Sequence, residues 1–415
     1  MRFIHAADIH LDSPLIGLER YEGAPHDALR GAARHAFRNL VRLAISERVD
    51  FVVIAGDLYD SDWRDYNTGL FLAKQMSELR ENGIRVFIVS GNHDAQSEIT
   101  KSLRLPDTVT FFPTQNAETV EIHDLGVAIH GRSYEKRAET DNFVPTYPVP
   151  VSGMLNIGIL HTNVDGQPGH DNYAPCRLDE LRNKGYDYWA LGHIHERAVL
   201  SEDPWIVYPG NIQGRHIRET GVKGCTIVSV DDGRIRTIEP VELDVARWEL
   251  CTVDVDGCET GDEVVARVSD ALQRSVANAD DRLLAVRIEV TGACKAHDDL
   301  VANPKKWDAQ IRGEATGFGA TPVWIEKIRF GTSVQYSLEE MERRDDAIGD
   351  LLRSIRELGD DDRVRDLVSD VTTDLNQKLP NGIDASYSDA ESVRELIEDV
   401  RQMLISRLLS TGGAS

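Results

Sequence analysis

Long apolar runs are missing from this chain of 415 residues. No stretch approaches the roughly 18 uninterrupted apolar residues of a membrane-spanning helix, so we expect no membrane span. The opening segment is interrupted by Asp8, His10 and Asp12, whereas the central region of a secretory signal is apolar. We therefore expect a cytoplasmic protein.

Cysteine is scarce, and its spacing is irregular. The chain has five cysteines, and Cys251 and Cys258 lie seven residues apart with no second pair or nearby histidine to complete a metal site. An odd number of widely spaced cysteines does not form a disulfide framework. Reduced thiols in a cytosolic protein explain this pattern better.

Positive charge is also limited. Lys and Arg number 46 against 70 Asp and Glu, which gives a formal net charge of −24. Such acidity opposes general attraction to phosphate backbones. Three explanations remain open: a small phosphoester substrate, DNA contact through a local basic groove or a partner, or adaptation to high salt. The ten lysines against thirty-six arginines fit a halophile, but a high-GC genome would favour the same ratio.

Potential metal ligands follow five short β-rich runs in the first half of the chain. The runs lie at 2–4, 51–55, 86–89, 155–160 and 188–191. The polar residues that follow them are Asp8, His10, Asp57, Asp60, Asn92, His93, Asp94, His161, His193 and His195. These residue types are costly to bury unless they are paired or bound to metal. Because loops beyond strand ends converge on one edge of an α/β fold, the sequence predicts a dinuclear metal site.

Helical patterns and glycines fill the gaps between these runs. Helices are predicted at about 27–48, 66–82 and 175–184. Three of the ligand motifs begin with a glycine, at Gly56, Gly91 and Gly192. We expect these glycines to form tight turns that bring backbone close to an ion.

Asp57 is the predicted bridge between the two ions. Two divalent ions about 3.5–4 Å apart can clamp a phosphoryl group and activate water near neutral pH. A carboxylate suits the bridging position, since its two oxygens can contact both ions. The His, carboxylate and amide ligands, without thiolates, favour manganese or iron over calcium or structural zinc.

The order D-x-H, G-D-x-x-D, G-N-H-D, H, G-H-x-H resembles that of the calcineurin-like metallophosphoesterase superfamily. Within it, the strings FIHAADIHLDSP at 3–14 and YPGNIQGRH at 208–216 are similar to the SbcD-type DNA-repair exonucleases, and most to their YhaO branch. The resemblance implies an αββα sandwich and a metal-dependent DNA exo- or endonuclease with two divalent ions, manganese above all. It also implies an SMC-like coiled-coil ATPase partner of the SbcC or YhaN type, and it allows a homodimer.

The resemblance also assigns roles to individual residues. Asp8, His10 and His195 would hold one metal, Asn92, His161 and His193 the other, and Asp57 would be shared. His93 would protonate the leaving oxygen or stabilise charge on the phosphate. An imidazole can supply a proton near pH 7, and either Asp60 or Asp94 could orient the ring.

A basic cluster follows the last metal motif. Arg215, His216 and Arg218, with Lys223 nearby, come soon enough after His195 to border the active site. We expect Arg215, His216 and Arg218 to contact substrate phosphate. The alternative is an ordinary solvated surface.

The length of the chain suggests two or three domains. We expect a metallophosphoesterase domain over 1–245, a small α+β domain over 246–335 and a helical segment over 336–415. The middle part shows strands at 250–255, 283–290 and 322–329 and helices at 260–276 and 296–311. By resemblance this domain would cap the active site and shape DNA access.

The final segment, 336–415, shows apolar residues at helical spacing and two capping boxes, at Ser337 and Ser388. It is either a helical hairpin packed on its own protein or a docking element for the ATPase, and we favour docking.

Two function classes stay open. The favoured one is a manganese-dependent DNA nuclease in DNA repair, and the alternative is a stand-alone phosphodiesterase for cyclic or dinucleotide substrates. A mainly structural subunit is a third possibility, which the intact ligand set argues against.

Overall fold

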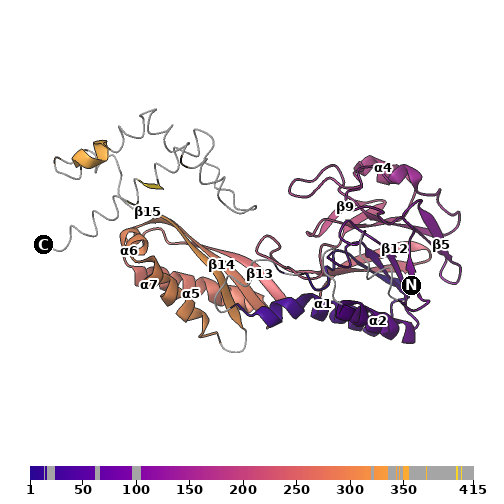
Figure 1. Cartoon of the computed structure of the whole chain (residues 1–415), viewed down its shortest axis with the longest axis horizontal. Coiled ribbons are helices and arrows are strands. Elements are labelled where there is room, and N and C mark those ends of the chain that lie inside the picture. Colours follow the sequence, from indigo (N-terminus) through magenta and orange to yellow (C-terminus); the bar gives the residue numbers. More distant parts are fainter. Residues whose placement is uncertain are drawn as a thin grey trace. The chain divides into compact units, whose positions relative to one another are not determined.

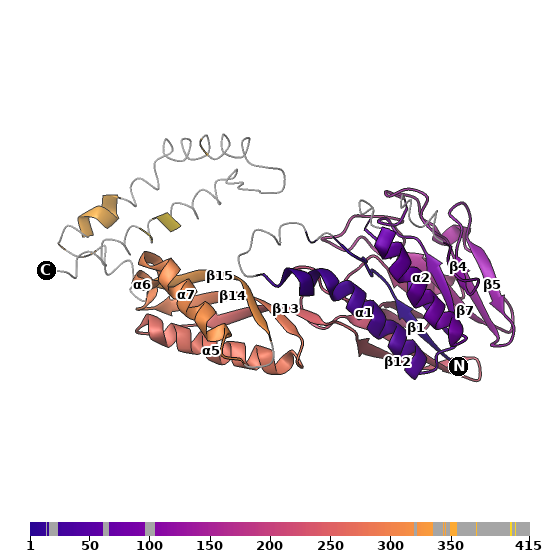
Figure 2. The same ribbon diagram turned by 60° about the horizontal axis from the view of Figure 1, so that its bottom comes forward.

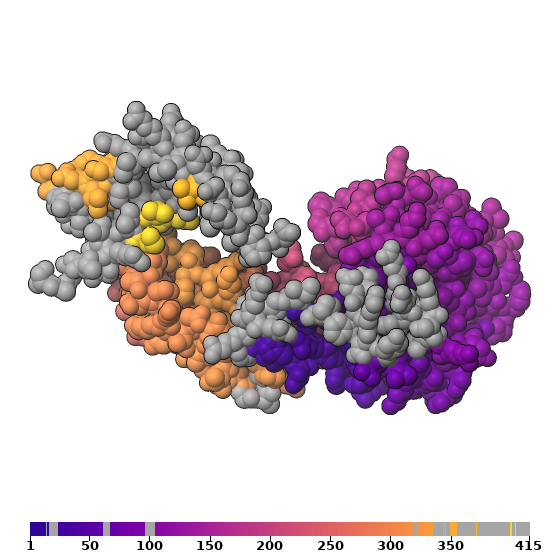
Figure 3. Space-filling model, in the orientation of Figure 1, coloured from indigo at the N-terminus to yellow at the C-terminus, as the bar shows by residue number. Residues whose placement is uncertain are grey.

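The computed structural model divides the chain into two compact units (Figures 1 and 3). The first unit holds Met1–Glu249 and Asp281–Ala285, and the second holds Leu250–Asp280 and the residues from Val286 on. The residues that the structure describes are 1–13, 15, 24–60, 66–95, 104–318, 322–334, 343, 345, 349–354, 371, 399–400 and 403. The helices expected over 336–415 therefore lie almost wholly outside the described residues.

Two six-stranded sheets form the centre of the first unit. One has the order β12-β11-β1-β2-β3-β4 and the other β5-β6-β7-β8-β10-β9. The strands of the first sheet are β1 (Arg2–Ala6), β2 (Phe51–Ala55), β3 (Arg85–Val89), β4 (Val109–Phe111), β11 (Gly224–Asp231) and β12 (Arg234–Glu242). Those of the second are β5 (Glu118–Ile122), β6 (Val127–Gly131), β7 (Leu155–His161), β8 (Tyr188–Gly192), β9 (Ala198–Glu202) and β10 (Trp205–Tyr208). In each sheet four successive strands are parallel, β1 to β4 and β6-β7-β8-β10.

The parallel strands are continuous apolar runs because both of their faces are buried. Along β1, Phe3 faces the second sheet, whereas Ile4 faces the helices. The same alternation in β2 places the side chain of Val53 between the sheets and that of Val52 against the helices. The sandwich core thus lies between two sheets whose parallel strands all end at one edge.

Helices α1 (His26–Ser46) and α2 (Tyr66–Glu81) lie side by side over the outer face of the first sheet, as Figure 2 shows. The outer face of the second sheet is covered by a short helix, α4 (Leu178–Asn183), a 3-10 turn, η2 (Val144–Thr146), and loops. The expected αββα layering is confirmed. The helix expected from 175 starts only at Leu178, because Cys176 forms a β-bridge with Val164 instead.

The second unit follows the expected β-α-β-α-β order with one difference. Its sheet has the order β13-β14-β15. The elements are β13 (Ala246–Asp254), α5 (Gly261–Asn278), β14 (Leu283–Cys294), α6 (His297–Ala302), α7 (Pro304–Ala315) and β15 (Val323–Val334). The single helix expected at 296–311 is two helices that meet at Asn303, because Pro304 has no N–H and begins a new helix.

The sequence predicts neither a membrane-spanning helix nor disulfide bonds. Among the described residues, no helix is both long enough and apolar enough to cross a membrane. All five cysteines lie in described parts of the chain, and each is a buried free thiol.

Candidate metal centre

All seven predicted ligands lie at the edge where the parallel strands of both sheets end. Asp8 and His10 follow β1, Asp57 follows β2, and Asn92 follows β3. His161 is the last residue of β7, and His193 and His195 follow β8. The two sheets therefore each contribute ligands to one pocket, which Asp57, Asn92, His93, His193 and His195 line together with Gly169, His170 and Asp171.

The backbone of the ligand loops is held in sharp turns. Asp8 N donates to Gly56 O at 3.1 Å, and His10 N donates to Asp57 O at 3.0 Å. Asp8, His10, Asp57 and His193 all have positive φ, from 46° to 101°, which is costly for residues with a Cβ. Strained backbone of this kind persists where the surrounding structure enforces it, often at functional sites.

The glycines before the ligands make room for ligand side chains. A Cβ on Gly91 would stand 2.3 Å from Asp57 Oδ1, and one on Gly56 would stand 2.3 Å from His161 Nδ1. Gly56 also has a φ of +92°. The atoms that Gly56 and Gly91 admit thus belong to His161 and Asp57. The expected approach of the glycine backbone to an ion stays a prediction.

The first cluster consists of Asp8, His10 and His195, whose ligand atoms all lie within 4.8 Å of one another. His10 Nδ1 donates to Asp60 Oδ1 at 3.0 Å, and His195 Nδ1 donates to Glu219 Oε1 at 2.7 Å. Because ionised carboxylates only accept, both rings carry their proton on Nδ1. The two Nε2 atoms therefore present lone pairs to each other across 3.3 Å. A cation between them would turn this repulsion into coordination.

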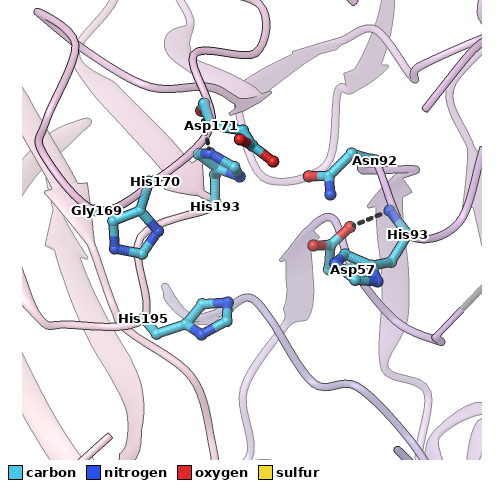
Figure 4. A pocket seen from close by; sticks show the side chains of 8 residues that line it. All are labelled: Asp57, Asn92, His93, Gly169, His170, Asp171, His193 and His195. Atoms are coloured by element: carbon cyan, nitrogen blue, oxygen red, sulfur yellow. Dashed lines mark hydrogen bonds between the residues drawn. The ribbon is translucent and has the colours of Figure 1, made fainter. Parts of the chain in front are cut away.

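The second cluster repeats this pattern around His161. Its Nδ1 donates to Ala55 O at 2.9 Å, so Nε2 presents a lone pair. That atom faces Asn92 Oδ1 at 2.9 Å and Asp57 Oδ2 at 3.5 Å. His193 donates from Nε2 to Asp171 O at 2.8 Å, which leaves its Nδ1 as the lone-pair atom. Figure 4 shows His193 and Asn92 on facing sides of the pocket.

Asp57 lies between the two clusters. Its Oδ1 accepts from His93 N at 2.9 Å, whereas its Oδ2 is buried without a hydrogen-bond partner. Oδ2 is 3.7 Å from His10 Nε2 and 3.5 Å from His161 Nε2, one ring from each cluster. A buried oxygen without a partner is unfavourable unless a cation neutralises it, so the donor set fits two divalent ions.

Burial keeps the charge pattern suited to metal binding. It lowers the pKa of His10 to about 4 and that of His193 to about 3, so both rings are neutral at pH 7, as metal ligands must be. Burial raises the pKa of Asp57, but the rings of His161, His10 and His93 outweigh it and lower that pKa to about 2. The carboxylate is therefore ionised.

His93 is bound to Asp60. Its Nδ1 lies 2.7 Å from Asp60 Oδ1. Burial lowers the pKa of His93, but the hydrogen bond to Asp60 and the negative charges of Asp57 and Asp60 together outweigh burial and raise the pKa. Asp94, the other candidate to orient this ring, accepts hydrogen bonds from the backbone N of Leu58, Tyr59 and Gly91. Asp94 thus fastens the loops after β2 and β3 to each other, and Asp60 is the carboxylate on the ring.

The three basic residues of the predicted substrate site differ in their surroundings. Arg215 Nη2 donates to Glu219 Oε1 at 2.9 Å, and its Nη1 lies 3.7 Å from Asp60 Oδ2. Arg215 therefore links the two carboxylates that hold His195 and His10. His216 and Arg218 are exposed, and they line a second pocket beside the first.

Sequence reasoning missed three residues of this site. Glu219 holds His195, and its only sequence signal is the four-residue spacing from Arg215. His170 and Asp171 belong to a loop without a motif, and only the fold brings them to the pocket, where His170 packs against His193 and His195 (Figure 4).

Two family models match this chain. Residues 1–197 match the model of the calcineurin-like phosphoesterases, and residues 248–333 match the middle domain of metallophosphoesterase YhaO. The chain is 38% identical over 278 residues to an uncharacterized metallophosphoesterase YhaO of Bacillus subtilis (strain 168), which covers 66% of this chain and 68% of that protein.

More distant similarity extends to proteins named DNA double-strand break repair protein Mre11. That of Methanopyrus kandleri is 28% identical over 305 residues, or 65% of this chain and 62% of its own length. That of Sulfurisphaera tokodaii is 24% identical over 272 residues, or 61% and 66%.

Two solved structures are similar to part of this chain at low sequence identity. A dimetal phosphatase from Danio rerio has a TM-score of 0.33 and 15% identity, over 56% of this chain and 93% of its own. The protein TT1561 of Thermus thermophilus has a TM-score of 0.35 and 13% identity, over 58% and 98%.

Proposed function

Because the chain belongs to the YhaO family of calcineurin-like metallophosphoesterases, we propose that it is a metal-dependent DNA exo- or endonuclease of DNA repair. It is a phosphoester hydrolase by family. The single observation that carries the proposal is Asp57 Oδ2, a buried oxygen without a hydrogen bond between two sets of facing lone pairs. The names of the Mre11 relatives support the DNA-repair part. As its partner we propose an SMC-like coiled-coil ATPase, which the sequence resemblance implies.

The proposed metal ligands divide into two sets. Asp8, His10 and His195 hold one ion, and Asn92, His161 and His193 hold the other, with Asp57 shared. Imidazole, carboxylate and amide donors without thiolate suit manganese, which we propose for both positions. When bound, the two ions would act as Lewis acids on the phosphoryl group and activate water.

The chain's own residues supply orientation and a proton. Asp60 accepts from Nδ1 of both His10 and His93, so one carboxylate sets the position of a ligand ring and of the proposed acid. Because Asp60 holds the Nδ1 proton of His93, the ring has Nε2 left to carry a second proton. We propose that His93 Nε2 donates this proton to the leaving oxygen.

The net charge supports a second candidate function. A chain with a formal charge of −24 is poorly suited to hold a long polyanion by itself. A stand-alone phosphodiesterase for cyclic or dinucleotide substrates would have the same metal centre and would need less basic surface.

One substrate panel separates the two functions. The manganese-loaded protein is tested against linear duplex DNA, single-stranded DNA, bis(p-nitrophenyl) phosphate and cyclic nucleotides, with chelated protein as the control. We expect cleavage of DNA and of the aryl diester, lost on chelation and restored by manganese. Rapid hydrolysis of a cyclic nucleotide with no cleavage of DNA, with or without the ATPase, would favour the second function.

A further inference from the structure

A second hollow adjoins the metal pocket in the first unit. The two hollows share Gly169, His170 and His195, so one wall of the metal pocket is also a wall of its neighbour. Figure 4 shows His170 and His195 on the side of the metal pocket opposite Asn92 and His93. A substrate that leaves the metal pocket past His195 would enter this second hollow.

The second hollow carries more positive than negative charge, in contrast to the whole chain. Its cationic side chains are those of Arg215, Arg218 and Lys223, with the imidazole of His216, and its carboxylates are those of Glu196 and Glu219. The local excess of cations stands against a formal net charge of −24 for the chain. Anionic ligands are therefore attracted to this hollow more than to the average surface.

Two of the cationic side chains in this hollow form hydrogen bonds with other residues of the protein. Lys223 Nζ donates to His195 O at 2.9 Å and is only 7% exposed, and Arg215 is held by Glu219. Arg218 is exposed, and so is His216, although its Nε2 also lies 3.6 Å from Glu219 Oε1. These two side chains are the groups of the hollow that can reach a bound anion.

The segment that carries them is anchored before any ligand binds. Glu219 accepts from Arg215 N at 2.7 Å and from Asn211 Nδ2 at 3.0 Å. Trp248 Nε1 donates to Gly214 O at 3.1 Å. An anchored backbone loses little conformational entropy when a ligand binds, so the contacts of His216 and Arg218 add directly to affinity.

We propose that this hollow is a subsite for a second phosphate, that of the nucleotide next to the scissile bond, and that His216 and Arg218 contact it. The inference rests on the proposed nuclease function and names its substrate class as polynucleotides. A polynucleotide strand carries a phosphate on every nucleotide, whereas a cyclic mononucleotide or a simple aryl diester has none beyond the one that reacts. From the sequence we expected Arg215 to contact substrate phosphate as well. In this proposal Arg215 instead positions Glu219.

Two pairs of chromogenic esters test the subsite. One pair is thymidine 5′-(p-nitrophenyl phosphate) with and without a 3′-phosphate, and the other is thymidine 3′-(p-nitrophenyl phosphate) with and without a 5′-phosphate. All four release p-nitrophenol, so kcat/KM is compared with one readout. We expect the phosphorylated member of one pair to be preferred by roughly tenfold or more, the usual effect of charge-assisted contacts to one phosphate. A preference ratio near one in both pairs would overturn the proposal.

Three variants test which side chains cause the preference for the phosphorylated ester. Arg218→Ala and His216→Ala should each bring the ratio of the responsive pair towards one, and raised salt should do the same in the wild type. Arg236→Ala is the matched control, because Arg236 is a half-exposed cation of the same unit that pairs with Asp231 and lines neither hollow. Its ratio should equal that of the wild type. Thermal unfolding and metal content confirm that each variant is folded. A ratio that survives in both Arg218→Ala and His216→Ala would place the second phosphate elsewhere and overturn the proposal.

A binding measurement separates this inference from the proposed function. Calorimetry on the manganese-loaded protein compares thymidine 3′,5′-bisphosphate with thymidine 5′-monophosphate and thymidine 3′-monophosphate, in the wild type and in Arg218→Ala. If none of the four esters is cleaved, calorimetry alone decides on the subsite, and the DNA substrates of the panel above decide on the nuclease proposal. Tighter binding of the bisphosphate that Arg218→Ala weakens would support the subsite. Equal affinity for all three ligands would overturn it.

Discussion

At the scale of single residues, Asp57 lies between the two ligand clusters of the metal pocket. One carboxylate oxygen accepts from His93 N, and the other lies within 3.7 Å of a histidine from each cluster. We therefore predict that Asp57→Ala abolishes phosphodiester cleavage and lowers the bound metal from two ions towards one or none. Elemental analysis and an aryl diester assay measure both effects. Full activity of this variant in chelating buffer would rule out a dinuclear centre.

His93 should affect chemistry without affecting metal binding. Its Nδ1 contacts Asp60. Among the residues that the structure describes, no hydrogen bond joins its ring to the ligand atoms of either cluster. We predict that His93→Ala retains close to two ions and loses about 10²–10⁴-fold in turnover, the usual loss of a general acid. His123→Ala is the matched control, since His123 is an exposed histidine whose side chain is 77% accessible. Loss of metal together with activity would make His93 a ligand.

Glu219 should act on metal affinity through His195. It accepts from His195 Nδ1 at 2.7 Å and so directs Nε2 towards the first cluster. Carboxylate partners of ligating histidines commonly contribute about 10–100-fold to metal affinity. We predict a loss of this order at one of the two ions in Glu219→Gln, measured by competition with a chelator. Glu196→Gln, which changes an exposed carboxylate of the neighbouring hollow, should leave both affinities unchanged. Unchanged affinity in Glu219→Gln would mean that packing alone orients His195.

At the scale of elements, the parallel strands and their ligands were predictable because each strand is apolar on both faces and stops at a polar motif. Contacts that depend on the tertiary fold were not predictable. Strand β10 inserts between β8 and β9, and this order depends on pairing in space. The hydrogen bond from His195 to Glu219 joins residues 24 apart, with β9 and β10 between them, so no local periodicity marks it. The break at Pro304 did have a local signal, the missing N–H of proline, which the apolar spacing over 296–311 obscured.

His5 connects the two sheets through its ring. Nδ1 lies 2.9 Å from Tyr188 Oη, and Nε2 lies 3.1 Å from Leu191 O, so a side chain of β1 contacts β8 in the opposite sheet. Burial lowers the pKa of His5 to about 3, below that of an exposed imidazole. The unfolded chain therefore binds the proton more readily than the folded one, and stability is lost as pH falls below about 6.5.

We predict that this residue alone removes about 2 kcal/mol of unfolding free energy between pH 7 and pH 5. His5→Gln cannot titrate, so its stability should fall less over the same range. Urea unfolding of both proteins in chelating buffer measures the difference, because the metal ligands then titrate alike in each. Parallel pH profiles for the two proteins would show that the His5 ring is not buried as a neutral group.

At the scale of the whole molecule, acidity and a DNA substrate have to be reconciled. Residues 336–415 contain nineteen acidic and ten basic side chains, so their net charge of −9 adds to the acidity of the chain. The phosphate subsite that we propose beside the metal pocket would bind one strand locally, but its positive charge would not offset the long-range repulsion of a duplex. A partner that supplies DNA affinity would resolve this conflict, and a docking element on this chain would then be required.

The C-terminal segment is where we expect that partner to dock. Apolar residues at helical spacing suit a groove or a coiled coil, and β15 ends at Val334, so removing 336–415 interrupts no described strand. We predict that the truncated protein keeps manganese-dependent cleavage of an aryl diester but no longer co-purifies with the coiled-coil ATPase, and that ATP no longer affects its DNA cleavage. Leu352 is buried, as a self-packed hairpin also requires, and that model predicts an insoluble or inactive truncation. A soluble truncation that binds the ATPase at full strength would place the docking surface elsewhere.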